Sequence, residues 1–311
     1  MTFSRYLYLI LLLAFLTACG GSSPTNTPTN TPPPPTGRPL VLGDISDEPI
    51  ETIAGTQPIA DYLATQLATY GISHGEVKIA PDLDTMITMI ETGEVDIYFD
   101  SPYPVLVISD ATDAEPILRR FKYGVTEYHT VFFVAQDSPI TSLDELNGHM
   151  IAFEESFSTS GYMLPLSYLI ENDYNPTLKP APDAIINDDE IGYTFSTADD
   201  TTIQWVVSGR VTAGAIDNVT LGRLPPETQE QLRVIAATGD VPRQLVLVRP
   251  GLDPNLVTAI HDELLTMDEN EAGQAALEAF LTTQFDEFPE GATIALQRMR
   301  ELYELVQLSD Q

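Results

Sequence analysis

Three consecutive hydroxyl residues, Ser158, Thr159 and Ser160, precede Gly161 at a point where a helix is expected to begin. Serine and threonine at a helix start commonly cap it by accepting hydrogen bonds from its first N–H groups. The same hydroxyl and N–H groups can also hold an oxyanion, aided by the positive end of the helix dipole. The spacing therefore allows two roles, of which capping is the more common.

Carboxylates form a second set of candidates, because Asp44, Asp100, Asp199 and Asp217 each lie at or soon after the end of a predicted strand. Open α/β sheets bind ligands at the carboxyl ends of their strands. Each aspartate could equally be a solvated loop residue, a turn residue or a helix cap, and Asp44 is the least specific of them. Tyr103 could stack on a ligand or hydrogen-bond to it, although such aromatic residues are at least as often core.

Strand-like and helix-like segments alternate from residue 39 onward. Strands are expected at 39–43, 77–80, 95–99, 128–135, 150–153, 192–195, 213–216 and 243–248. Helical spacing occurs between several of these runs and again over 254–281 and 292–308. The initial β-α-β-α-β order predicts parallel strands joined by right-handed crossovers.

The middle of the chain is expected to form a second α/β lobe inserted into the first. This second lobe spans 136–241, and the first comprises 38–135 together with 242–311. Two α/β lobes joined by two strands form a cleft at their junction, which is where a ligand is expected.

The N-terminal segment has the pattern of a signal peptide over residues 1–18, with Arg5 before an apolar run at 6–16. That run is shorter than the roughly 20 residues that span a bilayer. It ends in Leu-Thr-Ala-Cys19, which resembles the lipobox of bacterial lipoproteins and implies that Cys19 carries a lipid; the alternative is an ordinary signal peptide with a chance cysteine. Because Cys19 is the only cysteine, disulfides are excluded.

Residues 20–37 contain only Gly, Ser, Pro, Thr and Asn, so the lipidated end, 19–37, is expected to be a disordered, extended tether. The formal net charge is −32, and about −33 once Arg5 is removed. Such a surface repels nucleic acid and anionic lipid headgroups. Few of the 14 Lys and Arg residues fall in the candidate loops, so the hydroxyl groups are the expected anion ligands.

The run Ser-Thr-Ser-Gly-Tyr at 158–162, with a predicted strand before it and Pro165 after it, resembles the signature of the PhnD-like phosphate, phosphite and phosphonate-binding proteins of ABC importers. The likeness continues at 83–99, 137–148 and 206–217. The hydroxyl motif is fairly specific, whereas the other stretches occur in type II binding proteins generally. The resemblance implies an α/β, two-lobe type II periplasmic-binding-protein fold with two mixed sheets flanked by helices.

The resemblance also implies site roles: residues 158–161 grip the phosphonate head, and Asp217 binds an amine. Two departures matter, because Asp199 stands where the family often has histidine and Asp100 where it often has glycine. An unpaired carboxylate roughly 4 Å from a unit negative charge costs about 4 kcal/mol at an effective dielectric constant of about 20. A ligand with an amine beside its acid group would instead gain a partner.

Neither a serine-hydrolase elbow, a zinc-protease motif nor a phosphate-binding loop occurs in the sequence, so we expect no enzyme, metal or cofactor. We expect an extracytoplasmic solute-binding lipoprotein, monomeric and anchored to the membrane on its periplasmic or cell-surface side. It would deliver a small ligand, a phosphonate-type oxyanion or an amine-bearing relative, to the permease of an ABC importer. The alternatives are a ligand-sensing module for a membrane signalling kinase and an enzyme on the same fold.

Overall fold

The computed structural model describes residues 37–309, whose strands form two six-stranded sheets and one two-stranded ribbon. The first sheet contains β1 (Arg38–Ile45), β2 (Ile72–Ala80), β3 (Ile97–Asp100), β4 (Glu115–Lys122), β13 (Gln244–Val248) and β14 (Thr282–Asp286). The second contains β6 (Thr130–Ala135), β7 (Met150–Phe153), β8 (Pro176–Leu178), β9 (Ile191–Phe195), β10 (Ala213–Asp217) and β11 (Leu232–Ala237). The ribbon pairs β5 (Glu127–Tyr128) with β12 (Val241–Pro242).

Both sheets are mixed. The first has the strand order β14-β4-β13-β3-β1-β2, with β1 parallel to β2 and β3 but β13 antiparallel to β3 and β4. The second has the order β11-β6-β10-β7-β9-β8, with β6 antiparallel to both of its neighbours and parallel pairing from β10 to β8. The predicted fold class of two mixed sheets flanked by helices is therefore confirmed.

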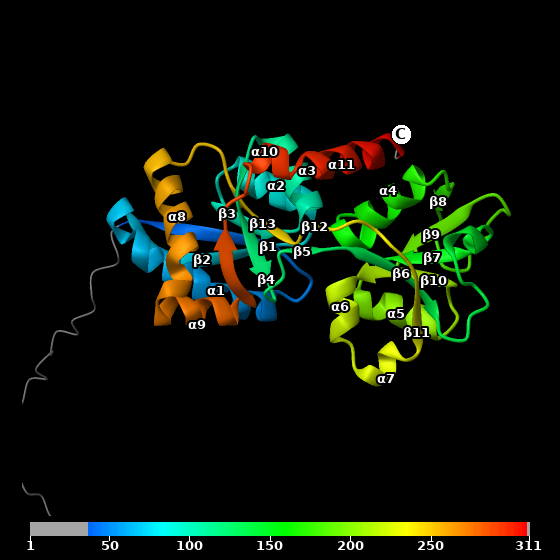
Figure 1. Ribbon diagram of the computed structural model, residues 1–311. Helices are drawn as coiled ribbons and strands as arrows, with labels where there is room; N and C mark the ends of the chain where they lie inside the picture. Colours follow the sequence, from blue (N-terminus) through cyan, green and yellow to red (C-terminus); the bar gives the residue numbers. More distant parts are fainter. Residues whose placement is uncertain (1–36, 310–311) are drawn as a thin grey trace, which may run out of the picture. The chain divides into compact units, whose positions relative to one another are not determined.

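Helices flank each sheet (Figure 1). Those of the first lobe are α1 (Pro49–Gln66), α2 (Leu83–Glu91), α3 (Pro102–Thr112), α8 (Pro254–Thr266), α9 (Glu271–Ala279), α10 (Ala292–Ala295) and α11 (Gln297–Ser309). Those of the second lobe are α4 (Leu164–Glu171), α5 (Asp199–Val207), α6 (Asn218–Arg223) and α7 (Pro226–Gln229), with a π-helical turn at Thr159–Met163 leading into α4. Short 3₁₀ turns occupy Leu67–Tyr70, Leu143–Leu146 and Met267–Glu269.

Burial explains why the central strands read as continuous apolar runs. All five residues of β13 are buried, as are Leu40 to Gly43 in β1, because helices cover both faces of the first sheet. One hydrophobic cluster runs from Val41 in the first lobe to Phe153 in the second without a break. The C-terminal helix α11 contributes Leu302 to this cluster and packs against both α3 and α4. The two lobes therefore share a core behind the cleft.

Two features of the sheets differ from the sequence expectations. The strand β6 was expected to close the first lobe at residue 135, but it pairs with β10 and β11 in the second sheet. The chain consequently crosses between the lobes at β5, where it pairs with the returning strand β12 (Figure 1). Strands β8, β11 and β14 were not expected, and neither was β4, where Pro116 and three basic residues interrupt the apolar pattern. Strand β4 proves to lie between β14 and β13.

Candidate functional site

A polar cavity of about 400 Å³ is lined by residues of both lobes. Its walls come from the carboxyl ends of β1, β3 and β10, from the segments after β7 and β9, and from β4, β5 and the start of β13. This is where open α/β sheets bind ligands. The charged side chains that line it are Asp44, Asp100, Arg120, Lys122, Glu154, Glu155, Asp199, Asp217 and Arg243.

Six of the residues that the sequence singled out line this cavity together: Asp44, Asp100, Ser158, Ser160, Asp199 and Asp217. They come from five separate segments of the chain: near the end of β1, at the ends of β3 and β10, and after β7 and β9. The fold therefore brings two hydroxyl residues of the motif and all four predicted carboxylates to one place.

The other three predicted residues, Tyr103, Thr159 and Gly161, are buried and do not belong to the cavity lining. Thr159 has no exposed surface, and its Oγ1 accepts a hydrogen bond of 2.8 Å from the backbone N–H of Tyr103. Because Tyr103 lies in α3 of the first lobe, this bond joins the two lobes. A direct contact of Thr159 or Tyr103 with a ligand stays a prediction.

Ser158 caps the turn that follows it. Its Oγ accepts a hydrogen bond of 2.9 Å from the N–H of Gly161 and donates one of 2.8 Å to Glu154 Oε2. The capping role weighed from the sequence is therefore present in the structure. Among the other groups of the motif, the carbonyl oxygen of Ser160 accepts a hydrogen bond of 2.7 Å from the Thr130 hydroxyl.

Gly161 is required by packing. A Cβ atom at this position would lie 2.4 Å from the Cβ atom of Glu154, closer than two side chains can approach. The carbonyl oxygen of Gly161 also accepts a hydrogen bond of 3.1 Å from the N–H of Glu154. The absence of a side chain lets the segment 158–161 pack directly against the chain that leaves β7.

Asp217 is the N-cap of α6 and is buried. Its Oδ1 accepts hydrogen bonds from the N–H groups of Val219 at 2.9 Å and Thr220 at 3.0 Å, and its Oδ2 accepts one from the Thr220 hydroxyl at 2.7 Å. Arg243 Nη2 lies 3.9 Å from Oδ2. The carboxylate is thus held rigidly at the cavity wall and balances part of the arginine charge.

The remaining carboxylates are crowded, and burial with mutual repulsion raises their pKa values. Burial followed by the charges of Asp217 and Asp100 raises the pKa of Glu154, while burial and the Glu154 carboxylate raise that of Asp199 well above its usual range. The pKa of Glu155 rises to about 7, chiefly through burial, and that of Asp44 to about 6 for the same reason. The Glu155 carboxylate is therefore only partly ionised near pH 7.

Arg120 and Lys122, both on β4, are cavity residues that sequence reasoning missed. The Arg120 guanidinium is buried and uses its donors on the protein: Nε binds Thr282 Oγ1 at 2.7 Å, Nη1 binds Gln244 Oε1 at 2.7 Å and Nη2 binds the Phe280 carbonyl oxygen at 2.6 Å. Burial lowers the pKa of Arg120 to about 9 and, with the charges of Arg120 and Arg243, that of Lys122 to about 8.

Tyr128 and Arg243 were missed as well, and both keep unused donors. The Tyr128 hydroxyl and the Arg243 Nε atom are buried and have no hydrogen-bond partner within residues 37–309. The Arg243 guanidinium carbon lies 4.3 Å from the centroid of the Tyr128 ring. Burial raises the pKa of Tyr128 to about 12, so its hydroxyl remains a donor at neutral pH.

The local sequence carries little signal for these four residues. Arg120, Lys122 and Arg243 belong to no motif, and Arg120 pairs with Gln244 across two strands that are far apart in the chain. The sequence feature that could have indicated a cationic site is the clustering of three of the 14 basic residues at 119–122. Few of the 14 basic residues fall in the candidate loops, as expected, but strand pairing places three others in the cavity wall.

In the described part of the chain, no group of three or more His, Cys, Asp or Glu residues could hold a metal ion. No helix within residues 37–309 is long and apolar enough to cross a membrane. The predicted lipidation residue Cys19 lies outside the described residues, as do the signal peptide and nearly all of the tether.

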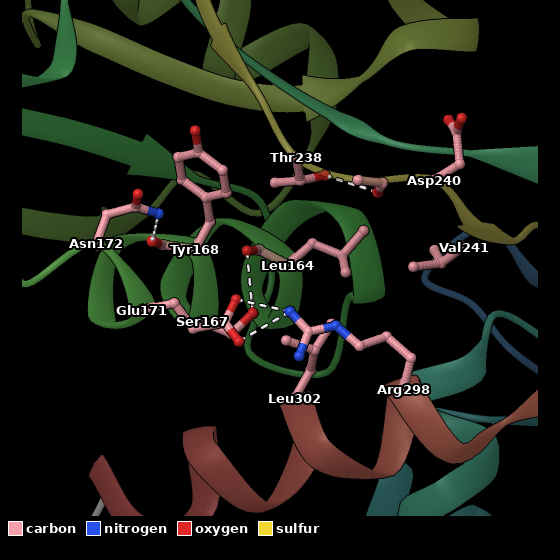
Figure 2. A pocket seen from close by; sticks show the side chains of 11 residues that line it. Leu164, Ser167, Tyr168, Glu171, Asn172, Thr238, Asp240, Val241, Arg298 and Leu302 are labelled. Carbon is pink, nitrogen blue, oxygen red and sulfur yellow. Dashed lines mark hydrogen bonds and ion pairs between the residues drawn. The ribbon is translucent and has the colours of Figure 1, made fainter.

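A second pocket, of about 180 Å³, lies where α11 meets α4 and the segment that leads into β12 (Figure 2). Figure 2 shows the Arg298 side chain of α11 pointing at Glu171 of α4; Nη2 donates to both carboxylate oxygens, at 2.8 and 2.7 Å. Leu164 and Leu302 line the same pocket. This contact ties the last helix of the first lobe to the second lobe, away from the polar cavity.

Comparison with solved structures identifies close relatives of this architecture. A protein from Xanthomonas citri, solved with bound chloride ion, is 30% identical, with a TM-score of 0.81 over 86% of this chain and 97% of that one. The same protein was also solved bound to ATP, with a TM-score of 0.80 over 86% of this chain and 96% of that one.

More distant neighbours share the fold. A binding-protein component of an ABC phosphonate transporter from Pseudomonas aeruginosa is 18% identical, with a TM-score of 0.66 over 88% of each chain. A protein from Prochlorococcus marinus in complex with methylphosphonate is 17% identical, with a TM-score of 0.67 over 87% of this chain and 98% of that one. The family model of ABC-transporter phosphonate periplasmic substrate-binding proteins matches residues 45–290. The chain therefore belongs to the family of phosphonate-type periplasmic substrate-binding proteins of ABC transporters.

Proposed function

We propose that this protein is an extracytoplasmic solute-binding lipoprotein that delivers a phosphonate-type oxyanion, or an amine-bearing relative of one, to the permease of an ABC importer. The observation that carries this proposal is the composition of the 400 Å³ cavity. It combines cations and unused donors, which suit an oxyanion, with carboxylates, which suit an amine. Its volume is within the range of small-molecule sites.

The relatives narrow the choice of ligands to test. One fold neighbour is in complex with methylphosphonate, and the relative at 30% identity was solved with ATP. Both molecules carry tetrahedral phosphorus oxyanions, which Lys and Arg bind well. The crowded carboxylates in this cavity favour the smaller molecule with fewer negative charges, because each unpaired carboxylate repels a phosphate group.

A thermal-shift panel tests the ligand class directly. It should contain methylphosphonate, 2-aminoethylphosphonate, phosphite, phosphate, methanesulfonate, ATP and amino acids. We expect phosphonates to raise the unfolding temperature, and an amine-bearing phosphonate to raise it more than methylphosphonate. A shift with ATP alone would reassign the ligand, and no shift with any phosphorus oxyanion would refute the proposed class.

Two further measurements test the anchor and the binding mode. The Cys19→Ser variant should be released from membranes or left unprocessed, whereas a processed variant that resists carbonate washing would refute lipidation. Small-angle scattering should show a smaller radius of gyration when a thermal-shift hit saturates the protein, because two-lobe binders close on their ligands. An unchanged radius at saturation would argue against hinge closure.

A further inference from the structure

Lys122, Tyr128 and Arg243 form one group in the cavity wall, which we call the crossover subsite. Tyr128 lies in β5, and Arg243 directly follows β12, the strand that pairs with β5. The N–H of Arg243 donates to the carbonyl oxygen of Thr126 at 2.8 Å. This backbone pairing holds the guanidinium against the face of the Tyr128 ring, 4.3 Å from its centroid.

The donors of the crossover subsite lack protein partners. Within residues 37–309, neither Arg243 Nε nor the Tyr128 hydroxyl makes a hydrogen bond, although Arg243 is 9% exposed and Tyr128 only 1%. The ammonium group of Lys122 lies 5.9 Å from the centroid of the Tyr123 ring and donates no hydrogen bond to the described residues. Buried polar groups are almost always satisfied, so these donors indicate a bound molecule that accepts hydrogen bonds.

Three of the neighbouring candidates for anion binding are already engaged. Ser158 Oγ both donates to Glu154 and accepts from Gly161, and Thr159 Oγ1 accepts from Tyr103 of the other lobe. Arg120 uses three of its nitrogen atoms on protein oxygens. Ser158, Thr159 and Arg120 therefore have less free hydrogen-bonding capacity than the residues at the crossing between the lobes.

We propose that the oxyanion of the ligand binds to Lys122, the Tyr128 hydroxyl and Arg243, and that the hydroxyl segment, residues 158–161, mainly stabilises the cavity wall. This inference rests on the proposed function and names its anion subsite. A phosphonate, phosphate or sulfonate oxygen can accept from an ammonium, a phenol and a guanidinium at once. The carboxylate of Asp217, with those of Glu154 and Asp199 beside it, remains for a cationic group on the same ligand.

Calorimetric titration with methylphosphonate and with phosphate tests the subsite. The variants R243Q, K122M and Y128F should each bind these probes more weakly, by about tenfold to a hundredfold for the two charged residues and less for the neutral hydroxyl. The matched controls R210Q, K78M and Y70F make the same chemical changes outside the cavity and should bind like the wild type. R243K keeps the charge but loses the Nε donor, so its affinity should fall between those of R243Q and the wild type.

The outcomes separate this inference from the proposed function. If the wild type binds a phosphorus oxyanion and R243Q, K122M and Y128F bind it equally well, the proposed function stands and the crossover subsite is refuted. If the wild type binds neither these probes nor any phosphorus oxyanion of the thermal-shift panel, the proposed ligand class fails first. The unfolding temperature of each variant shows whether it folds. If R243Q or K122M does not fold, the affinities of R243K and Y128F, which change fewer groups, decide the result.

Discussion

Two polar regions border the same cavity and differ in their hydrogen bonding. One is the hydroxyl segment, residues 158–161, and the other is the crossover subsite of Lys122, Tyr128 and Arg243. Ser158 and Thr159 are engaged with protein groups, whereas the Tyr128 hydroxyl and Arg243 Nε have no partner in the described part of the chain. The segment is recognisable in the sequence because local structure requires it. The subsite is not, because its residues meet only across paired strands.

The difference separates two uses of polar residues beside a cavity. Donors and acceptors that satisfy one another stabilise the wall and hold its shape. Donors that remain buried and unused carry a free-energy cost that a bound ligand removes. The hydroxyl segment should therefore affect stability more than affinity, and the crossover subsite should affect affinity more than stability.

The largest effect on stability is expected from G161A. The new Cβ would have to displace the backbone near Glu154, and overpacking of this kind costs about 2–3 kcal/mol. Thermal unfolding should show this loss. G222A is the control, since nothing lies within 4 Å of a Cβ built on Gly222. A G161A protein as stable as the wild type would show that the segment tolerates a side chain.

A smaller loss is expected from T159V, which keeps the shape of the side chain but removes the acceptor of the Tyr103 N–H. Leaving that buried donor unsatisfied should cost about 1–2 kcal/mol of unfolding free energy. Affinity for methylphosphonate should fall by less than about threefold, because the effect of Thr159 on the ligand is indirect. The change in binding free energy should therefore be well below the roughly 1.4 kcal/mol that corresponds to a tenfold change in affinity. An exposed helical threonine provides the control T258V. A loss of tenfold or more in affinity without loss of stability would instead support direct ligand binding by Thr159.

D217N should change selectivity and leave the fold intact. Asparagine caps helices about as well as aspartate, so α6 should persist while the charge is lost. Affinity for an amine-bearing phosphonate should fall about tenfold, as expected for one charged hydrogen bond. Affinity for simple oxyanions should stay the same or improve. D253N alters the cap of α8 outside the cavity and is the control. Equal weakening of both ligand types would mean that Asp217 shapes the pocket without selecting charge.

The smallest effect is expected in the pH dependence of the free protein. Burial, followed by the charges of Glu154, Asp47 and Asp100, raises the pKa of Glu155 to about 7. The unfolded chain therefore releases this proton at lower pH than the folded protein does, and stability contributed by Glu155 falls as pH rises from its ordinary pKa near 4.5 to about 7.

The unfolding temperature of E155Q should thus decline less between pH 5 and 7.5 than that of the wild type. E91Q, an exposed residue outside the cavity, should follow the wild-type profile. Parallel profiles for wild type and E155Q would show that the crowding around Glu155 does not affect stability.

Much of the architecture follows from local patterns. Apolar runs such as Leu40 to Gly43 predicted buried strands, and the hydroxyl residues before Gly161 predicted a helix start. Asp100 and Asp217 were expected at strand ends, and both line the cavity at the ends of β3 and β10. These predictions succeed because strand and helix boundaries depend on neighbouring residues and on the burial that their pattern implies.

Only the tertiary structure decided which polar groups meet. The β4 strand joins the first sheet between β14 and β13, which brings Arg120 and Lys122 to the same wall as Arg243. The bond from Tyr103 to Thr159 likewise joins residues of different lobes. Strand order and lobe contacts are set by packing between segments far apart in the chain, so no local spacing encodes them. For the same reason, the net charge of −32 did not predict that Arg120, Lys122 and Arg243 would line one cavity.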